Sequence, residues 1–301
     1  MQPPPAAAAA DDAVPHAADP TEAQQALAFD KTTEKGAEKG LFRACMASIR
    51  SAHVSANRLR AALVLSGLFT DRKVYREAIA LFYLATDALE KKIAALHETE
   101  GDEICGKLLS LGYRFGPLYE RDLLHLYGRG WRAAVEAVAA GATDGAGAYL
   151  RAIEDMASGA ELAGAAFCLW GALVIGGGAA AGPRVESLCG KGACHLFGPV
   201  TGPGRGERKK RFVALWDGLA VPCESGSGGN DGAGKDNDND NDESFDRIVA
   251  ASKDCMQGNN ELIVSVRRNP WWLKYVASVG VAVVAFGLSC LHRGGGPGGK
   301  P

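Results

Sequence analysis

The chain has 301 residues, and its 33 Lys and Arg residues nearly balance its 35 Asp and Glu residues, giving a formal net charge of −2 at pH 7. Nothing in this overall balance calls for nucleic-acid binding, and short basic clusters such as 209–211 are usually solvated surface, so we expect no nucleic-acid partner. The length suits one or two domains and is ample for a hydrophobic core.

Residues 1–35 are rich in Ala and Pro, contain no arginine and show no strong apolar face. This composition suits neither a packed core nor an Arg-rich transit peptide. We therefore expect a disordered tail.

Helical patterns dominate residues 36–222, and strand-like alternation is scarce, so the predicted fold class is all-α. Segments 38–65, 71–98, 119–138 and 147–174 carry these patterns. In the first, apolar residues recur every three or four positions near the face that holds His53: Phe42, Cys45, Ile49, Ala56, Leu59 and Leu63. In the second, Asp71 stands where it can cap the start of the helix.

Residues 168–183, "CLWGALVIGGGAAAGP", are apolar and contain three consecutive glycines, Gly176 to Gly178. Each glycine inside a helix costs about 1 kcal/mol relative to alanine, so the run predicts a break in the helix. One interpretation is close packing of small residues between helices. The other is a flexible helix that lies over a flat ligand.

Residues 223–243 are rich in Gly and Ser and then in Asp and Asn, which predicts a disordered acidic insertion. A calcium site in the Asp-Asn repeat is disfavoured, because the EF-hand Gly and terminal Glu are missing. Helical character resumes at 244–268, and we expect this last helix to pack back on the core.

Residues 270–293 have no charge between Tyr275 and Leu291 and carry aromatic and basic residues at their flanks. About 20 apolar residues suffice to cross the hydrocarbon layer, so we expect a C-terminal transmembrane helix that acts as a tail anchor. Arg267 and Arg268 favour a main domain on the cytosolic side. The alternative is a buried core helix.

The eight cysteines form no CxxC pair, and we expect reduced thiols in a cytosol-facing protein. The nearest approach to a metal motif is Cys189, Cys194 and His195. Because this group lacks a second ligand pair, the sequence does not favour a zinc site.

His53 lies in the middle of a predicted helix, three residues after Arg50. A helical histidine is more often packed or exposed than a ligand. Neutral imidazole is nevertheless a good iron ligand, and a basic residue one turn away could pair with an anionic group of a cofactor.

Five blocks occur in an order that matches a known family. They are "SIRSAHVSAN", "SGLFTDRKVYREAIALFYLATDALEKKI", "ERDLLHLYGRGW", "LWGALVIGGG" and "RIVAASKDCMQGNNELI". Over about residues 38–268 the sequence resembles the haem oxygenases, and with the tail anchor it resembles the membrane-bound animal forms. The third block is the most specific local match.

The resemblance implies one compact all-α domain that holds haem between a proximal and a distal helix, with His53 as the iron ligand. It implies oxidative cleavage of haem to biliverdin, carbon monoxide and ferrous iron, with O2 and electrons from an NADPH-dependent reductase. Haem is then both cofactor and substrate. By the same resemblance we expect a tail-anchored protein on the cytosolic face of the endoplasmic reticulum membrane.

The resemblance assigns the distal catalytic positions to Gly171 and Gly176, whose missing side chains make room for dioxygen. It also places Ala172 where the family has its catalytic Asp. The nearest acids in the sequence, Glu161 and Glu186, are ten or more residues away, which is about 15 Å along a helix.

The cofactor-binding positions implied by the resemblance are Met46, Arg50, Lys210 and Met256. Met46 and Arg50 fall on basic positions of the proximal helix, and Lys210 lies slightly upstream of the basic positions that follow the distal helix. Met256 falls where the family packs an aromatic side chain near the haem.

Three hypotheses therefore compete. The protein is an active haem oxygenase with a rearranged distal network, or a haem-binding homologue that does not degrade haem, such as a sensor, carrier or pseudoenzyme. The third is a helical membrane-tethered scaffold without haem.

Overall fold

The structure is a computed structural model that describes residues 40–176, 178–219 and 237–266. Every regular element in these ranges is helical, which confirms the all-α prediction. The α-helices are α2 (Leu41–Ser48), α3 (Arg50–Leu65), α4 (Arg72–Glu100), α5 (Glu103–Ser110), α6 (Gly116–Tyr127), α7 (Trp131–Ala140), α8 (Asp144–Asp155), α9 (Gly159–Val174), α10 (Gly178–Cys189), α11 (Arg205–Leu219) and α12 (Asn237–Ser265). Short 3₁₀ helices are η1 (Gly128–Gly130), η2 (Lys191–Ala193) and η3 (His195–Val200).

Several predictions from the sequence lie outside the described residues. They are the disordered tail at 1–35, the greater part of the acidic insertion (223–236) and the tail anchor at 270–293. Within the described ranges, none of the helices combines the length and the apolar character that crossing a membrane requires.

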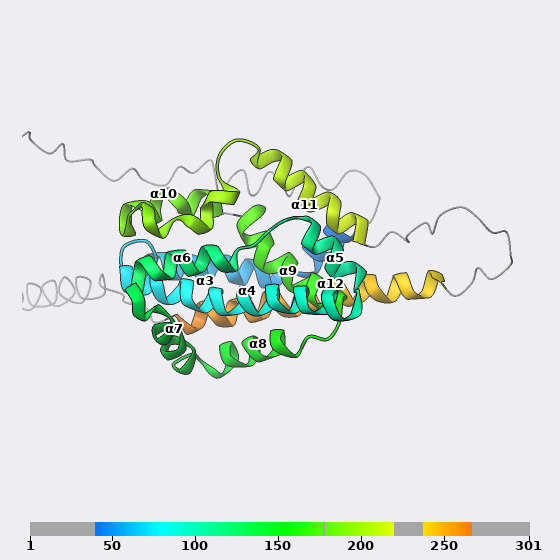
Figure 1. Ribbon diagram of the computed structural model, residues 1–301, viewed down its shortest axis with the longest axis horizontal. Coiled ribbons are helices and arrows are strands. Elements are labelled where there is room, and N and C mark those ends of the chain that lie inside the picture. The colour runs from blue at the N-terminus through cyan, green and yellow to red at the C-terminus, as the bar shows by residue number, and fades with distance from the viewer. Residues whose placement is uncertain (1–39, 177, 220–236, 267–301) are drawn as a thin grey trace, which may run out of the picture. The chain divides into compact units, whose positions relative to one another are not determined.

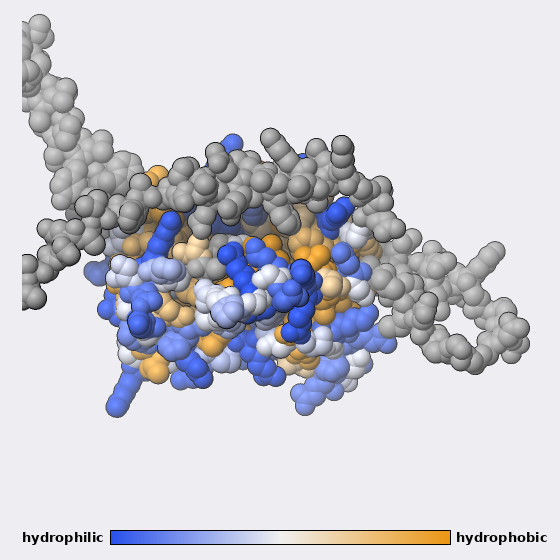
Figure 2. All heavy atoms as spheres, turned by 90° about the horizontal axis from the view of Figure 1, so that it is seen from above, coloured by the Kyte–Doolittle hydropathy of each residue, from blue (hydrophilic) through white to orange (hydrophobic). Residues whose placement is uncertain are grey.

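Helix α9 is the central element of the fold (Figure 1). It packs against α12, α4 and α5, and every residue but one from Gly159 to Trp170 is buried. A helix that is apolar on all sides is stable in water only when other helices surround it. On the face seen from above, polar residues predominate and apolar ones are scattered among them (Figure 2).

Helices α9 and α12 approach closely at Gly164. A Cβ atom there would lie 2.5 Å from Ala251 Cβ and 2.6 Å from the backbone nitrogen of Ser252. One turn later, the Cys168 thiol donates a hydrogen bond to the Ser252 carbonyl at 3.1 Å. Glycine at this position therefore sets the distance between the two helices.

The first predicted helix, 38–65, is divided at Ile49 into α2 and α3. The Ser48 hydroxyl donates to the Cys45 carbonyl at 2.8 Å and lies 3.3 Å from the Val249 carbonyl of α12. Serine hydroxyls compete in this way with helix hydrogen bonds. The apolar face survives the break, because Cys45 and Ile49 are both buried.

Helix α4 begins as predicted. The Asp71 carboxylate accepts a hydrogen bond from the Lys73 N–H at 2.7 Å, which is an N-cap. Farther along α4, the Glu90 carboxylate accepts the N–H groups of Phe115 and Gly116 at 2.7 and 3.0 Å. Glu90 thereby satisfies backbone donors at the start of α6.

Helix α12 begins at Asn237, within the segment predicted to be disordered, and ends at Ser265. The sequence predicted this helix over 244–268 instead. Asn and Asp disfavour helix interiors only weakly, so the composition of the segment did not determine where the helix begins.

The block "ERDLLHLYGRGW" contributes a buried carboxylate, Asp122 of α6. It accepts the backbone N–H groups of His195 and Leu196 at 2.8 and 3.0 Å, and its Oδ1 lies 2.9 Å from His195 Nδ1. Burial raises the pKa of the Asp122 carboxyl, and these donors oppose the rise. These hydrogen bonds hold η3 against α6. The residues that the structure describes include no cluster of side chains suited to a metal ion.

Candidate functional site

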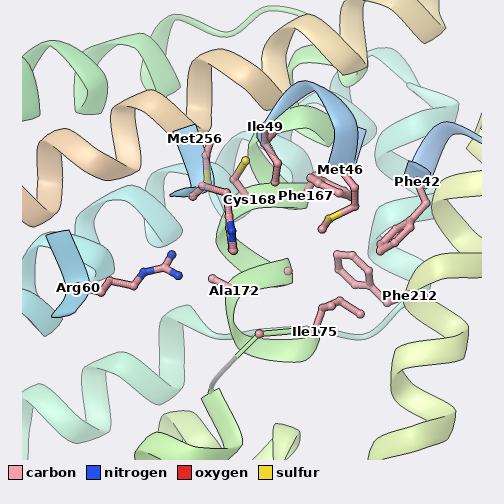
Figure 3. Close-up of a pocket in the computed structure, with 13 residues that line it drawn as sticks. Phe42, Met46, Ile49, Arg60, Phe167, Cys168, Ala172, Ile175, Phe212 and Met256 are labelled. Carbon is pink, nitrogen blue, oxygen red and sulfur yellow. The ribbon is translucent and has the colours of Figure 1, made fainter. Parts of the chain in front are cut away.

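A pocket lies between α2 and α3 on one side and α9, α11 and α12 on the others (Figure 3). The lining residues are Phe42, Met46, Ile49, His53, Arg60, Phe167, Cys168, Gly171, Ala172, Ile175, Gly176, Phe212 and Met256.

The pocket brings together six of the positions singled out from the sequence. These are Met46, His53, Gly171, Ala172, Gly176 and Met256. They come from segments far apart in the chain, α2, α3, the end of α9 and α12. A ligand between α3 and α9 would therefore contact these six positions.

His53 is supplied by α3 and is partly buried. Burial lowers the pKa of its imidazole, and the nearby positive charge of Arg60 lowers it further. The ring is therefore neutral at pH 7, which is the form that binds a metal ion. One turn later, Asn57 Nδ2 lies 3.4 Å from His53 Nδ1.

The end of α9 forms the opposite wall, and the glycine run interrupts the helix as predicted, since α9 ends at Val174. The Gly176 N–H donates to the Gly171 carbonyl at 3.0 Å. A Cβ atom on Gly176 would lie 2.6 Å from the Ala172 carbonyl oxygen. Gly176 is thus required by the close turn at the end of the helix.

Gly171, unlike Gly176, lies beside a side chain of another helix. A Cβ atom there would lie 3.6 Å from Cζ of Phe212, an ordinary contact distance. The Phe212 ring of α11 therefore occupies the space beside Gly171. The sequence did not predict this contact, because about thirty residues, which form α10 and two short 3₁₀ helices, separate α9 from α11.

Ala172 faces the pocket where the resemblance expected an aspartate. None of the lining residues within the described ranges carries a carboxylate. The two nearest acids in the sequence are engaged elsewhere: Glu161 forms a capping box with Ser158 at the start of α9, and Glu186 lies 3.8 Å from Lys191. Neither replaces the missing acid.

Two of the predicted cofactor-binding residues are not in the pocket lining. Lys210 is exposed, and its Nζ lies 2.9 Å from Glu207. Arg50 is exposed on α3. The structure therefore does not bring these two basic residues to the pocket.

Arg60 lines the pocket and was missed in the sequence. Figure 3 shows its side chain reaching from α3 towards the middle of the pocket. Arg60 follows His53 by seven residues, two turns of helix, so the two side chains share a face. That spacing is the signal that could have identified it.

Aromatic rings close the opposite end of the pocket. The Phe42 ring centroid lies 5.4 Å from that of Phe167 and 6.4 Å from that of Phe212, both in edge-on geometry. Phe212 stacks on Trp216 with centroids 4.2 Å apart. These rings give the pocket one strongly apolar end.

No family model matches the sequence, and no curated protein matches it. Solved structures do match. The haem oxygenase 2 of Chlamydomonas reinhardtii, solved without haem, is 18% identical, with a TM-score of 0.60 over 76% of this chain and 99% of that one. The haem oxygenase-1 of Synechocystis sp. PCC 6803, solved with haem, is 13% identical, with a TM-score of 0.56 over 82% of this chain and 99% of that one.

A third solved structure, the haem oxygenase-2 of the same cyanobacterium in complex with haem and NO, is 17% identical and has a TM-score of 0.50 over 76% of this chain and 85% of that one. At these identities the likeness concerns the fold. The chain has the haem oxygenase fold.

Proposed function

We propose that the protein binds haem in the pocket between α3 and α9, with His53 as the ligand of the iron. The observation that carries this proposal is a neutral, partly buried imidazole on the wall of a mostly apolar pocket. His53 fits haem, because neutral imidazole is a common axial ligand of haem iron. Apolar and aromatic side chains suit a flat hydrocarbon ring.

The activity we propose is cleavage of haem to biliverdin, carbon monoxide and ferrous iron with O2 and an NADPH-dependent reductase. The bound haem would supply the redox-active iron and the ring that is opened. His53 would hold and orient the haem, and the apolar walls would exclude bulk water. Gly171 contributes only backbone to the α9 wall of the pocket.

A second candidate is a haem-binding homologue that does not degrade haem. It is favoured by Ala172, since no described lining residue offers a carboxylate that could hold a proton-delivering water. Proton delivery by positioned groups commonly contributes a factor of about 10² to 10⁴ to a rate. A sensor or carrier would not need that contribution.

Titration of the protein with hemin tests the haem proposal. We expect a Soret band that shifts when His53→Ala removes the ligand, while His97→Ala, on the exposed end of α4, leaves the band unchanged. An identical spectrum for wild type and His53→Ala would overturn the assignment of the ligand. Absence of hemin binding would favour the scaffold hypothesis.

A turnover assay separates the two haem-binding candidates. With a reductase, NADPH and O2, appearance of biliverdin absorbance supports the oxygenase, and its absence supports the non-degrading homologue. Ala172→Asp should raise the biliverdin yield if the protein lacks only the carboxylate that assists proton delivery. Ala172→Asn, of similar size but unable to release a proton, is the matched control and should not raise it.

We also propose that residues 270–293 anchor the protein in the endoplasmic reticulum membrane, with the main domain on the cytosolic side. The support is the uncharged run between Tyr275 and Leu291. The full chain should resist alkaline extraction from membranes, whereas a chain ending at residue 268 should be released. Release of both would overturn this proposal.

A further inference from the structure

Arg60 is a cation at the edge of an apolar pocket, and no residue in the described part of the chain pairs with its charge. Among the lining residues of the described ranges, only Arg60 has a permanent charge. No hydrogen bond or ion pair joins its guanidinium to any residue that the structure describes. Burial lowers the pKa of Arg60, but arginine remains protonated in proteins. Arg60 is only partly exposed, and removing part of the hydration of its charge is unfavourable unless a ligand compensates it.

The pocket has two chemically different ends. Figure 3 shows Arg60 at one end and Phe42 and Phe212 at the other. Met46 and Ile175 also lie towards the aromatic end. Because Cα–Cβ bonds tilt towards the N-terminus of a helix, the Arg60 side chain leans back towards His53. The guanidinium is therefore placed to contact the rim of a ligand that His53 holds.

We propose that Arg60 binds a carboxylate of the ligand, so that a haem lies with its carboxylate-bearing edge at the Arg60 end and its hydrocarbon edge against Phe42 and Phe212. This inference rests on the proposed haem binding. The planar guanidinium matches a carboxylate with two parallel hydrogen bonds. The reverse orientation would place the hydrocarbon edge of the haem, not its carboxylates, beside the Arg60 guanidinium. It also assigns to Arg60 the role that the sequence gave to Arg50 and Lys210.

The test compares hemin with its dimethyl ester, in which both carboxylates are blocked, by Soret titration of the full chain. Wild type should bind hemin more tightly than the ester, and added salt should reduce the difference. Arg60→Leu should weaken hemin binding about tenfold to a hundredfold and leave ester binding unchanged, because a charge-assisted hydrogen bond is lost only with hemin. The hemin affinity of Arg60→Lys should fall between those of wild type and Arg60→Leu.

Arg58→Leu is the matched control, since it removes the same charge from an exposed position of the same helix and should change neither affinity. Equal weakening of hemin and ester by Arg60→Leu, or no weakening of either, would overturn the inference while haem binding stands. If wild type bound neither compound, the proposed function would fall and the inference with it. If Arg60→Leu does not fold, the hemin affinities of wild type and of Arg60→Lys still test the inference. Equal affinities of wild type for hemin and for the ester would reject it.

Discussion

Asn57 Nδ2 lies 3.4 Å from Nδ1 of His53, one helical turn earlier on α3. An asparagine amide can present either its NH₂ group or its carbonyl oxygen, so it can pair with Nδ1 in either tautomer of the ring. When Nε2 binds a metal, Nδ1 carries the proton of the neutral ring and donates a hydrogen bond. Asn57 can therefore orient the imidazole without adding charge.

Asn57→Asp should raise the pKa of His53, because a carboxylate at this distance favours the imidazolium and strengthens the ring as a donor. NMR titration of the His53 ring in the ligand-free protein measures the change. In the hemin complex the same substitution should lower the iron reduction potential. Asn57→Leu, which cannot accept a hydrogen bond from Nδ1, should weaken hemin binding. A His53 pKa that stays fixed in Asn57→Asp would show that the two side chains do not interact in solution.

The depressed pKa of His53 predicts a pH dependence of stability. The unfolded chain titrates near 6.5, whereas the folded ring takes up its proton only at lower pH. As the pH falls below about 6.5, the unfolded state binds more protons, so the free energy of unfolding decreases until the folded pKa is reached. His53→Gln should remove this part of the dependence in urea unfolding at a series of pH values.

Arg60 contributes to the same shift, after burial. Arg60→Leu should therefore move the His53 titration upwards without restoring the value of an exposed histidine. Arg58→Leu should leave it in place. An unchanged titration in Arg60→Leu would show that burial alone depresses the pKa.

Asp122→Asn should destabilise the protein by about 2–3 kcal/mol, because the amide turns a donor towards N–H groups that need acceptors. The loss should appear as a lower urea midpoint with an unchanged slope. Glu207→Gln, which disrupts an exposed pair with Lys210, is the control and should leave the midpoint in place. Equal effects of the two substitutions would contradict the role given to the buried carboxylate.

Gly164→Val should cost about 3 kcal/mol or more, because the new side chain meets the α12 backbone, which cannot move aside easily. Gly147→Ala, near the start of α8, should instead stabilise by up to about 1 kcal/mol, since its Cβ would meet only the flexible end of Arg151. Thermal unfolding measures both. A mild effect of Gly164→Val would mean that α9 and α12 can separate.

Local sequence signals predicted those parts of the fold that depend on neighbouring residues. The long amphipathic pattern of α4 and its Asp71 cap are of this kind. The division at Ile49 was not predictable, because it involves a contact between Ser48 and Val249, 201 residues apart. Composition likewise failed to locate the start of α12 at Asn237.

The candidate site was predictable where a residue resembled a family position, as at His53 and Gly171. Arg60 has no counterpart among the quoted blocks, and only the helical spacing from His53 indicated it. The Phe212 wall depends on how α11 packs on α9, which the sequence does not express locally. The missing acid at Ala172 was visible in the sequence, and the described lining residues do not compensate for it.

The turn at Gly176 also has an electrostatic consequence. The last carbonyl groups of α9 point away from the helix at the edge of the pocket, where the peptide dipoles sum to roughly half a negative charge. This wall therefore has a negative potential, which disfavours a ligand carboxylate beside it. Unlike a carboxylate, peptide dipoles neither gain nor lose a proton, so the field at this wall stays constant across the pH range.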